Sequence, residues 1–269
     1  MIIPYTYHVH TSFSDGKATP KQMILSAIEA GCAEIGISDH SYLIDADWTM
    51  PLSKTPEYVS EIRELSDKYS EKIKVFLGIE LDVYSDICTE GFDYVIGSVH
   101  RVAIDGVWRD VDTSAEYTRE TVEKYFGGDP YAYCEAYYAE VEKIYEKTRC
   151  DVIGHFDLVT KFIERDGLFS EEHPRYIAAR DKALFALLKT PALFELNTGA
   201  MARGYRTSPY PHADVIRRIA EAGKSLVIAS DSHTPSTVVY GFEKALKMLE
   251  KMGASYTKSL SEILSVTRK

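Results

Sequence analysis

Short apolar runs alternate with amphipathic stretches along almost the whole of this 269-residue chain. The runs are continuous and rich in β-branched residues, which is typical of strands that are buried on both faces of a parallel sheet. They lie at residues 5–10, 34–38, 73–79, 94–99, 151–155, 193–197 and 225–230. The alternation therefore predicts an α/β fold built from repeated βα units.

Helix signals fill most of the intervals between these runs. Thr19 and Pro20 combine a cap with a proline at the first turn, and Gly31 follows the expected end of that helix. The other expected helices span residues 56–69, 130–147, 174–189, 211–223 and 236–253. No glycine-rich phosphate loop follows the first run, so a closed or nearly closed barrel is favoured over a doubly wound sheet.

Composition excludes several classes of protein. A net charge of −10 makes the chain a poor non-specific ligand for nucleic acid or an anionic membrane. No stretch approaches the ~18 apolar residues of a membrane span, and the first residues lack the basic and apolar regions of a signal peptide. Four cysteines without CxxC spacing favour reduced thiols. We therefore expect a cytoplasmic protein without membrane or nucleic-acid partners; the sequence leaves its oligomeric state open.

The longest departure from the βα pattern is residues 101–129, a polar segment after the fourth run. A long insertion on a βα loop usually shapes a site rather than a core. Its aromatic residues could form a lid, and the alternative is a surface excursion packed by its own side chains. These aromatic residues are Trp108, Tyr117, Tyr125 and Phe126.

Histidine and acidic residues collect at the ends of the predicted strands. One histidine at such a place is usually a hydrogen-bonded loop residue, but a set at corresponding positions is not expected by chance. Because the carboxyl ends of barrel strands share one rim, we expect the set to converge on one pocket. Its members are His8, His10, Asp15, His40, Glu80, His100, His155, Asp231 and His233. The other two histidines, His173 and His212, sit beside prolines at expected helix starts and are predicted to lie on the surface.

Imidazoles together with carboxylates are typical ligands of Zn, Mn and Fe, and the lack of cysteine in the set favours a catalytic site. Two divalent ions would neutralise the nearby carboxylates, and three would leave a field that attracts phosphate. These carboxylates are Asp15, Asp39, Glu80 and Asp231. The sequence therefore predicts two or three divalent transition-metal ions, and three ions would suit a small phosphorylated substrate if the substrate is a phosphate.

If the substrate is a phosphate ester, its contacts would come from cations and from acidic or aromatic residues near the same rim. Arg203 lies in a glycine-flanked segment after the sixth run and could bind phosphate bidentately, unless it is a solvated surface arginine. Lys161 is a second candidate for the phosphate, and Phe162, Asp157 or the insertion could contact the organic part. Either Asp231 or His233 could protonate the leaving group.

Read as motifs, these residues resemble the polymerase-and-histidinol-phosphatase (PHP) superfamily. The motifs are His8-Val-His10-Thr11, Ser14-Asp15-Gly16, Ser38-Asp39-His40, Glu80, His100, His155 and Ser230-Asp231-Ser232-His233. Within that superfamily the chain most resembles the histidinol-phosphate phosphatases. This finer likeness rests on residues 126–129, 135–138, 155–158, 161–162, 195–198 and 209–211.

The resemblance implies a distorted (β/α)7 TIM-like barrel, with residues 1–269 forming one PHP-type domain that carries the insertion. It also implies a trinuclear metal centre and the hydrolysis of L-histidinol phosphate to L-histidinol and phosphate in histidine biosynthesis. A hydroxide that bridges two ions would attack phosphorus. The alternatives are a PHP phosphoesterase acting on another small phosphate ester or on phosphotyrosine, and a non-catalytic metal-binding protein on the same scaffold.

The resemblance also distributes the ligands among three ions. The first ion would be held by His8, His10, Glu80 and Asp231. Glu80 would bridge to a second ion, which also takes His100 and His155. The third ion would be held by Asp15, His40 and His233, while Asp39 would orient its neighbours rather than bind.

Overall fold

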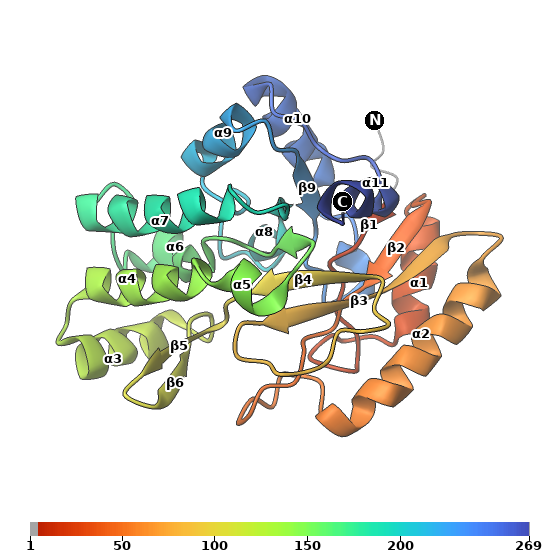
Figure 1. Ribbon diagram of the computed structural model, residues 1–269, viewed down its shortest axis with the longest axis horizontal. Helices are drawn as coiled ribbons and strands as arrows, with labels where there is room; N and C mark the ends of the chain where they lie inside the picture. The colour runs from red at the N-terminus through yellow and green to blue at the C-terminus, as the bar shows by residue number, and fades with distance from the viewer. Residues whose placement is uncertain (1–4, 269) are drawn as a thin grey trace.

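The computed structural model describes residues 5–268, and its centre is a seven-stranded sheet (Figure 1). All neighbouring strands are parallel, and the order is β1-β2-β3-β4-β7-β8-β9. The strands are β1 (Tyr5–Thr6), β2 (Glu34–Ile37), β3 (Lys74–Asp82), β4 (Tyr94–Ser98), β7 (Val152–Ile153), β8 (Leu193–Asn197) and β9 (Leu226–Ala229). The seven predicted runs thus correspond to these seven strands.

The two ends of the sheet meet just beyond β1 and β9. Val9 forms a parallel bridge with Ser232, whose backbone N–H donates to the carbonyl of His8 at 3.1 Å. The backbone N–H of His10 donates in turn to the carbonyl of Ser232 at 2.8 Å. The contact closes the sheet at its carboxyl edge, so the predicted distorted (β/α)7 barrel is confirmed.

Two strand boundaries differ from the prediction in a way that affects the site. Among residues 5–268, strand β1 consists of Tyr5 and Thr6, so His8 and His10 follow the strand instead of ending it. Strand β3 continues to Asp82, so Glu80 lies within the strand.

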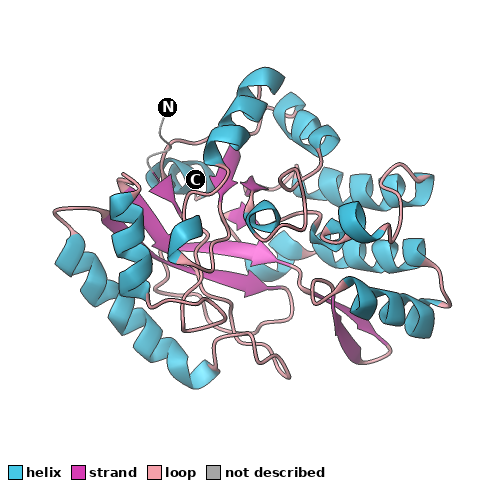
Figure 2. Cartoon of the chain, turned by 180° about the vertical axis from the view of Figure 1, so that it is seen from behind, coloured by secondary structure: helices cyan, strands magenta, loops and turns pink. Residues whose placement is uncertain are grey.

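Helices cover the outside of the sheet (Figure 2). The α-helices are α1 (Pro20–Glu29), α2 (Thr55–Tyr69), α3 (Ala115–Phe126), α4 (Pro130–Val141), α5 (Ile144–Thr148), α6 (Ile163–Asp166), α7 (Pro174–Leu187), α8 (Gly199–Ala202), α9 (Ala213–Glu221), α10 (Phe242–Met252) and α11 (Leu260–Thr267). Short 3₁₀ turns are η1 (Leu52–Lys54), η2 (Leu158–Thr160) and η3 (Pro235–Thr237). Within residues 5–268 the structure has no helix that is long and apolar enough to cross a membrane.

Three helix predictions need correction. The helix expected at 130–147 is broken into α4 and α5, and the helix expected from residue 236 begins only at Phe242. Helix α9 begins at Ala213 because His212 is its N-cap, whose Nδ1 accepts a hydrogen bond from the backbone N–H of Asp214. His173 caps α7 in the same way, so both histidines are half-buried caps and not free surface groups.

The insertion at 101–129 is ordered. It consists of an antiparallel hairpin, β5 (Arg101–Ile104) with β6 (Val107–Asp110), followed by helix α3. The hairpin and α3 lie below α4, away from the centre of the sheet (Figure 1). The guanidinium of Arg109 lies over the rings of Tyr117 and Tyr125, at 3.9 and 5.4 Å. The segment is therefore packed by its own side chains.

Aromatic side chains fill much of the space between the strands. The hydroxyl of Tyr94, on β4, crosses over Gly78 of β3 and donates to the carbonyl of Tyr7. A Cβ at Gly78 would overlap the Tyr94 ring, so only glycine fits there. Aromatic side chains thus occupy the interior of the sheet, and the polar side chains of the cluster lie at its carboxyl end.

Candidate metal centre

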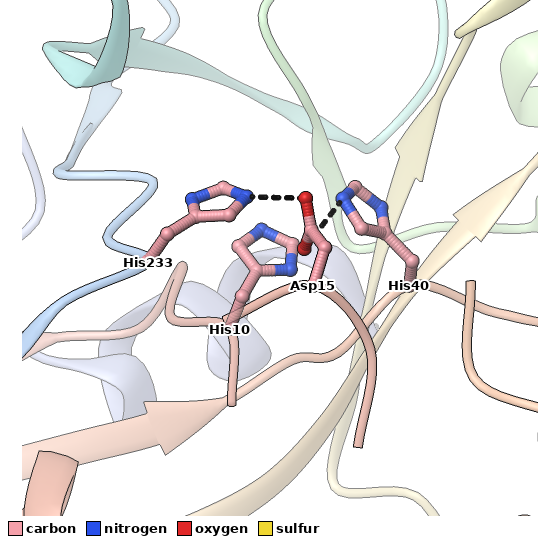
Figure 3. Close-up of side chains that lie close together, drawn as sticks. All are labelled: His10, Asp15, His40 and His233. Atoms are coloured by element: carbon pink, nitrogen blue, oxygen red, sulfur yellow. Dashed lines mark ion pairs between the residues drawn. The ribbon is translucent and has the colours of Figure 1, made fainter. Parts of the chain in front are cut away.

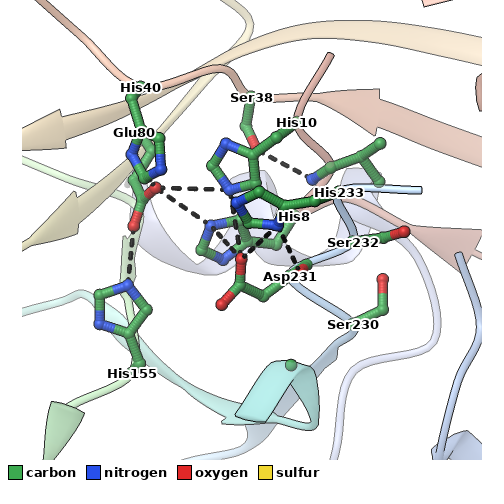
Figure 4. Close-up of polar contacts among 12 residues, drawn as sticks. His8, His10, Ser38, His40, Glu80, His155, Ser230, Asp231, Ser232 and His233 are labelled. Carbon is green, nitrogen blue, oxygen red and sulfur yellow. Dashed lines mark hydrogen bonds and ion pairs between the residues drawn. The ribbon is translucent and has the colours of Figure 1, made fainter. Parts of the chain in front are cut away.

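The nine predicted ligands converge at the carboxyl end of the barrel. Figure 4 shows His8, His10, His40, Glu80, His155, Asp231 and His233. Their ligand atoms form three groups, within each of which all of these atoms lie within 4.8 Å of one another. The groups are His8 with His10 and Asp231; His40 with Glu80 and His100; and His10 with Asp15, His40 and His233. His155 joins the second group through its contact with Glu80, at 2.9 Å.

Glu80 lies at the centre of this arrangement. Its carboxylate oxygens face imidazole nitrogens of five histidines, namely His40 at 2.8 Å, His155 at 2.9 Å, His8 at 3.3 Å, His100 at 3.4 Å and His10 at 3.5 Å. Burial raises the pKa of this carboxyl, but the surrounding imidazoles outweigh burial and hold the pKa well below its usual range. Glu80 is therefore a buried carboxylate that can be shared between ions.

Asp15 lies between two histidines at the outer edge of the cluster (Figure 3). Its carboxylate oxygens are 3.2 Å from Nε2 of His233 and 3.7 Å from Nε2 of His40. The ring of His10 stacks on that of His233, with centroids 4.2 Å apart. Burial and the neighbouring imidazoles lower the pKa of His10 well below its usual range, so this ring stays neutral and keeps a lone pair for a metal.

The loop that carries Asp15 is held by Asp39. The Asp39 carboxylate accepts hydrogen bonds from the backbone and hydroxyl of Thr11, at 2.8 and 2.7 Å. It also accepts from the backbone and hydroxyl of Ser14, at 3.1 and 2.5 Å. Asp39 thus orients the loop, and the groups of converging ligand atoms do not include it.

Asp231 is fixed by an arginine. The guanidinium of Arg203 donates to the Asp231 carboxylate and to its carbonyl, both at 3.0 Å, and lies 3.2 Å from Nδ1 of His233. Asp231 has a φ of 47°, a left-handed conformation that is uncommon outside glycine. A Cβ on Gly199 would lie 2.7 Å from this carboxylate, so glycine is required where α8 approaches it.

Some buried polar atoms of the cluster have no hydrogen-bond partner among residues 5–268. Several side-chain atoms have no hydrogen bond from the residues that the structure describes: Nε2 of His8, both nitrogens of His10, Oδ1 of Asp15, Oε2 of Glu80 and Nδ1 of His155. Buried polar groups are rarely left without a partner. Nε2 of His8 and Nε2 of His10 point toward Oε2 of Glu80, at 3.3 and 3.5 Å. Imidazoles among carboxylates fit divalent transition-metal ions, which would satisfy these atoms.

Sequence reasoning missed two carboxylates that hold the histidines. Glu195, on β8, lies 2.6 Å from Nδ1 of His8 and accepts the backbone N–H of His155 at 3.0 Å. Asp82, on β3, lies 3.1 Å from Nδ1 of His100. Each leaves the Nε2 atom of its histidine directed toward Glu80, as metal-binding imidazoles require. An acidic residue inside a buried apolar run was the available signal.

A cavity of about 500 Å³ opens beside the cluster. It is lined by Asp15, Lys17, His40, Trp48, His100, Asp112, Thr113, His155, Leu158, Lys161, Arg203, Asp231, His233 and Thr234. Arg203 and Lys161 reach it as predicted, but Phe162 does not line it. The Phe162 ring is buried instead against Tyr205, with centroids 5.3 Å apart.

Of the two alternatives for the insertion, the structure favours a surface excursion packed by its own side chains over an aromatic lid. The insertion contributes Asp112 and Thr113 to the lining, and none of its four candidate aromatic residues. Trp108 instead lies near Tyr84, with centroids 6.4 Å apart, and is 41 % exposed. The aromatic wall of the cavity is Trp48, whose ring is 4.8 Å from that of His40.

Comparison with known proteins decides the family. The model of the PHP domain matches residues 6–199, which include every predicted ligand except Asp231 and His233. The chain belongs to the PHP family.

The PHP relatives have similar names. A Deinococcus radiodurans protein named "Probable histidinol-phosphatase" is 30 % identical, covering 91 % of this chain and 92 % of its own. The histidinol-phosphatase of Lactococcus lactis is 24 % identical over 92 % of this chain and 90 % of its own.

Solved PHP structures share the fold. The HisK protein of Listeria monocytogenes superimposes with a TM-score of 0.76 and 23 % identity, covering 89 % of this chain and 99 % of its own. The Lactococcus lactis enzyme, crystallised with Zn, L-histidinol and phosphate, gives a TM-score of 0.68 with 22 % identity, over 96 % of this chain and 98 % of its own.

Proposed function

We propose that this PHP protein is a metal-dependent histidinol-phosphatase, which hydrolyses L-histidinol phosphate to L-histidinol and phosphate. The observation that carries the proposal is the buried Glu80 carboxylate among five imidazoles, at the edge of a cavity of about 500 Å³. A cavity of this size suits a small molecule. The relatives' names supply the substrate.

The metal assignment is part of the proposal. Two or three divalent ions (Zn, Mn or Fe) would be held by the nine residues, with His8, His10 and Asp231 around one ion and Glu80 shared with the next. The remaining ligands would be His100 and His155 for the second ion, and Asp15, His40 and His233 for the third. When bound, such ions lower the pKa of water to about 7 and stabilise negative charge on phosphoryl oxygens.

Arg203 would bind the phosphate. Its side chain is 30 % exposed and lines the cavity, and a guanidinium can pair with two phosphoryl oxygens. Hydrolysis breaks the bond between phosphorus and the ester oxygen, and that oxygen must gain a proton. Asp231 and His233 both line the cavity and are the candidates to supply it.

Two broader predictions accompany the proposed function. That residues 1–269 form one PHP-type domain is supported by the single barrel sheet, whose strands run from Tyr5 to Ala229. A cytoplasmic location without nucleic-acid or membrane partners stays a prediction from composition.

Removal and return of metal tests the proposal. The purified protein is treated with a chelator, dialysed and assayed for phosphate release from L-histidinol phosphate, before and after addition of Zn or Mn. We expect turnover to disappear and to return with the metal. Turnover that survives complete metal removal would contradict the metal-dependent mechanism, whereas full metal binding without turnover on any phosphate ester would favour a non-catalytic protein.

A further inference from the structure

The cavity contains one carboxylate that the proposed metal centre does not use. Three acidic residues line the cavity, and two of them, Asp15 and Asp231, belong to the proposed ligand set. The third is Asp112, which follows β6 and leads into α3. Its side chain is 31 % exposed at the cavity, so a ligand can reach it.

Lys161 holds Asp112 in place. The Lys161 ammonium donates to Oδ2 and to the carbonyl of Asp112, both at 3.0 Å. The ammonium also lies 5.5 and 5.2 Å from the ring centroids of Phe162 and Tyr205, which surround it with apolar surface. The Lys161 side chain is 10 % exposed and that of Arg203 is 30 % exposed, so Lys161 is less accessible to the phosphate than Arg203 is.

Asp112 keeps binding capacity and its charge. Among the residues that the structure describes, none donates a hydrogen bond to its second carboxylate oxygen, Oδ1. Burial raises the pKa of this carboxyl, but Lys161, His100 and His155 outweigh burial and lower the pKa to about 2. Asp112 is thus an ionised acceptor that faces the cavity.

The chemistry of the substrate needs such an acceptor. A phosphate monoester of an amino alcohol carries a dianion at one end and an ammonium next to it, and an ammonium taken out of water without an anionic partner is costly. Arg203 and the proposed metal centre would supply positive charge for the dianion. We propose that the Asp112 carboxylate binds the ammonium group of the substrate and that Lys161 is its positioning residue, an inference that rests on the proposed function.

The other residues that line the cavity fit a substrate whose phosphate lies at Arg203 and whose ammonium group lies at Asp112. Trp48 and Leu158 supply apolar surface for carbon atoms and a flat ring. The Trp48 ring is 5.2 Å from the His100 ring, so it lies next to the proposed metal centre. The inferred substrate class is therefore a small phosphate monoester with an amino group near the ester carbon, and not a neutral or acidic ester.

The test compares substrates that differ only in the ammonium group. The pair is L-histidinol phosphate and its deamino analogue, imidazolylpropyl phosphate, with Asp112→Asn as the variant and Asp105→Asn as the control. Asp105 lies in the same insertion, at the exposed hairpin turn, and asparagine tolerates its φ of 49°. Loss of a charged hydrogen bond predicts that Asp112→Asn lowers kcat/KM for the aminated ester by roughly 10- to 100-fold. The value for the deamino ester should change by less than about threefold, and the control variant should behave as the wild type.

Binding of the product supplies a second readout. Calorimetry should give weaker binding of L-histidinol to Asp112→Asn than to the wild type, with the metal content of both proteins unchanged. An equal loss for both esters would make Asp112 a structural residue and overturn the inference. If Asp112→Asn does not fold, the two esters are compared on the wild type and on Asp112→Glu, which keeps the charge. A wild type that does not prefer the aminated ester overturns the inference.

A simpler pair separates this inference from the proposed function. Aminoethyl phosphate and ethyl phosphate carry no imidazole, so they test the ammonium contact alone. If the wild type prefers the aminated member through Asp112 but does not favour L-histidinol phosphate over other esters, the proposed function fails and the inference stands. If the wild type favours L-histidinol phosphate equally with and without its amino group, the inference fails and the proposed function stands.

Discussion

Replacement of Glu80 by glutamine removes the charge at the centre of the proposed metal site with little change of shape. The hydroxyl of Ser98 donates to Oε1 at 2.6 Å, so the amide oxygen of the glutamine would take that position. The amide NH2 group would then replace Oε2, which lies 2.8 Å from Nδ1 of His40. An NH2 group donates hydrogen bonds and cannot serve as the anionic ligand that two ions would share.

The size of the effect follows from the burial of this carboxylate. Glu80 is 1 % exposed and faces five imidazoles, so solvent cannot compensate the lost charge. Removing one preorganised electrostatic contact from an active site raises the activation barrier by about 3–4 kcal/mol. At about 1.4 kcal/mol for each factor of ten, we expect kcat to fall by roughly 10²- to 10³-fold.

The assay is steady-state phosphate release from L-histidinol phosphate, with bound metal quantified by mass spectrometry on the same sample. Glu90→Gln is the matched control, because Glu90 is exposed and lies outside the cavity lining. A Glu80→Gln protein with full metal occupancy and near wild-type kcat would refute the assignment of Glu80 as a shared ligand.

Three further predictions follow from residues near Glu80 and from the buried polar atoms that have no hydrogen-bond partner in the described part of the chain. Arg203→Ala should raise KM by about tenfold or more, since a charged contact to phosphate is lost, and unchanged kcat and KM would exclude the phosphate-binding role. Glu195→Gln should weaken metal binding by roughly 10- to 100-fold in a competition titration. The reason is that the NH2 group would disturb either the contact with Nδ1 of His8 or the hydrogen bond from the backbone N–H of His155. Unchanged metal affinity would show that Glu195 does not affect metal binding. Metal at about 100 times its Kd should stabilise the chain by about 2.7 kcal/mol and raise Tm by about 5–10 °C, and a Tm indifferent to metal would argue against binding in the folded protein.

The barrel and the placement of the polar side chains could be predicted for one physical reason. Strands buried on both faces need unbroken apolar runs, and their carboxyl ends share a rim, so residues such as His40 and His155 could be placed without knowledge of the packing. The boundaries were less certain. Glu80 sits inside β3 because the strand continues along β4 to Asp82, and pairing partners cannot be read from one strand.

The supporting carboxylates could not be placed for a different reason. Glu195 and Asp82 lie in buried strands, where the sequence shows only an acidic residue among apolar neighbours. Which histidine each one contacts depends on how the strands are ordered around the barrel. The role of Asp112 required the fold of the insertion, because its contact with Lys161 joins segments 49 residues apart.

The most direct test of the account is the preference among substrates. The metal-loaded protein is assayed for kcat/KM on L-histidinol phosphate beside phosphotyrosine, a nucleoside monophosphate and a sugar phosphate. We predict that L-histidinol phosphate exceeds each of the others by about a hundredfold or more, since the contacts at both of its ends contribute to selectivity. Comparable rates on all four would contradict the histidinol-phosphatase assignment and would leave a PHP phosphoesterase of broader specificity.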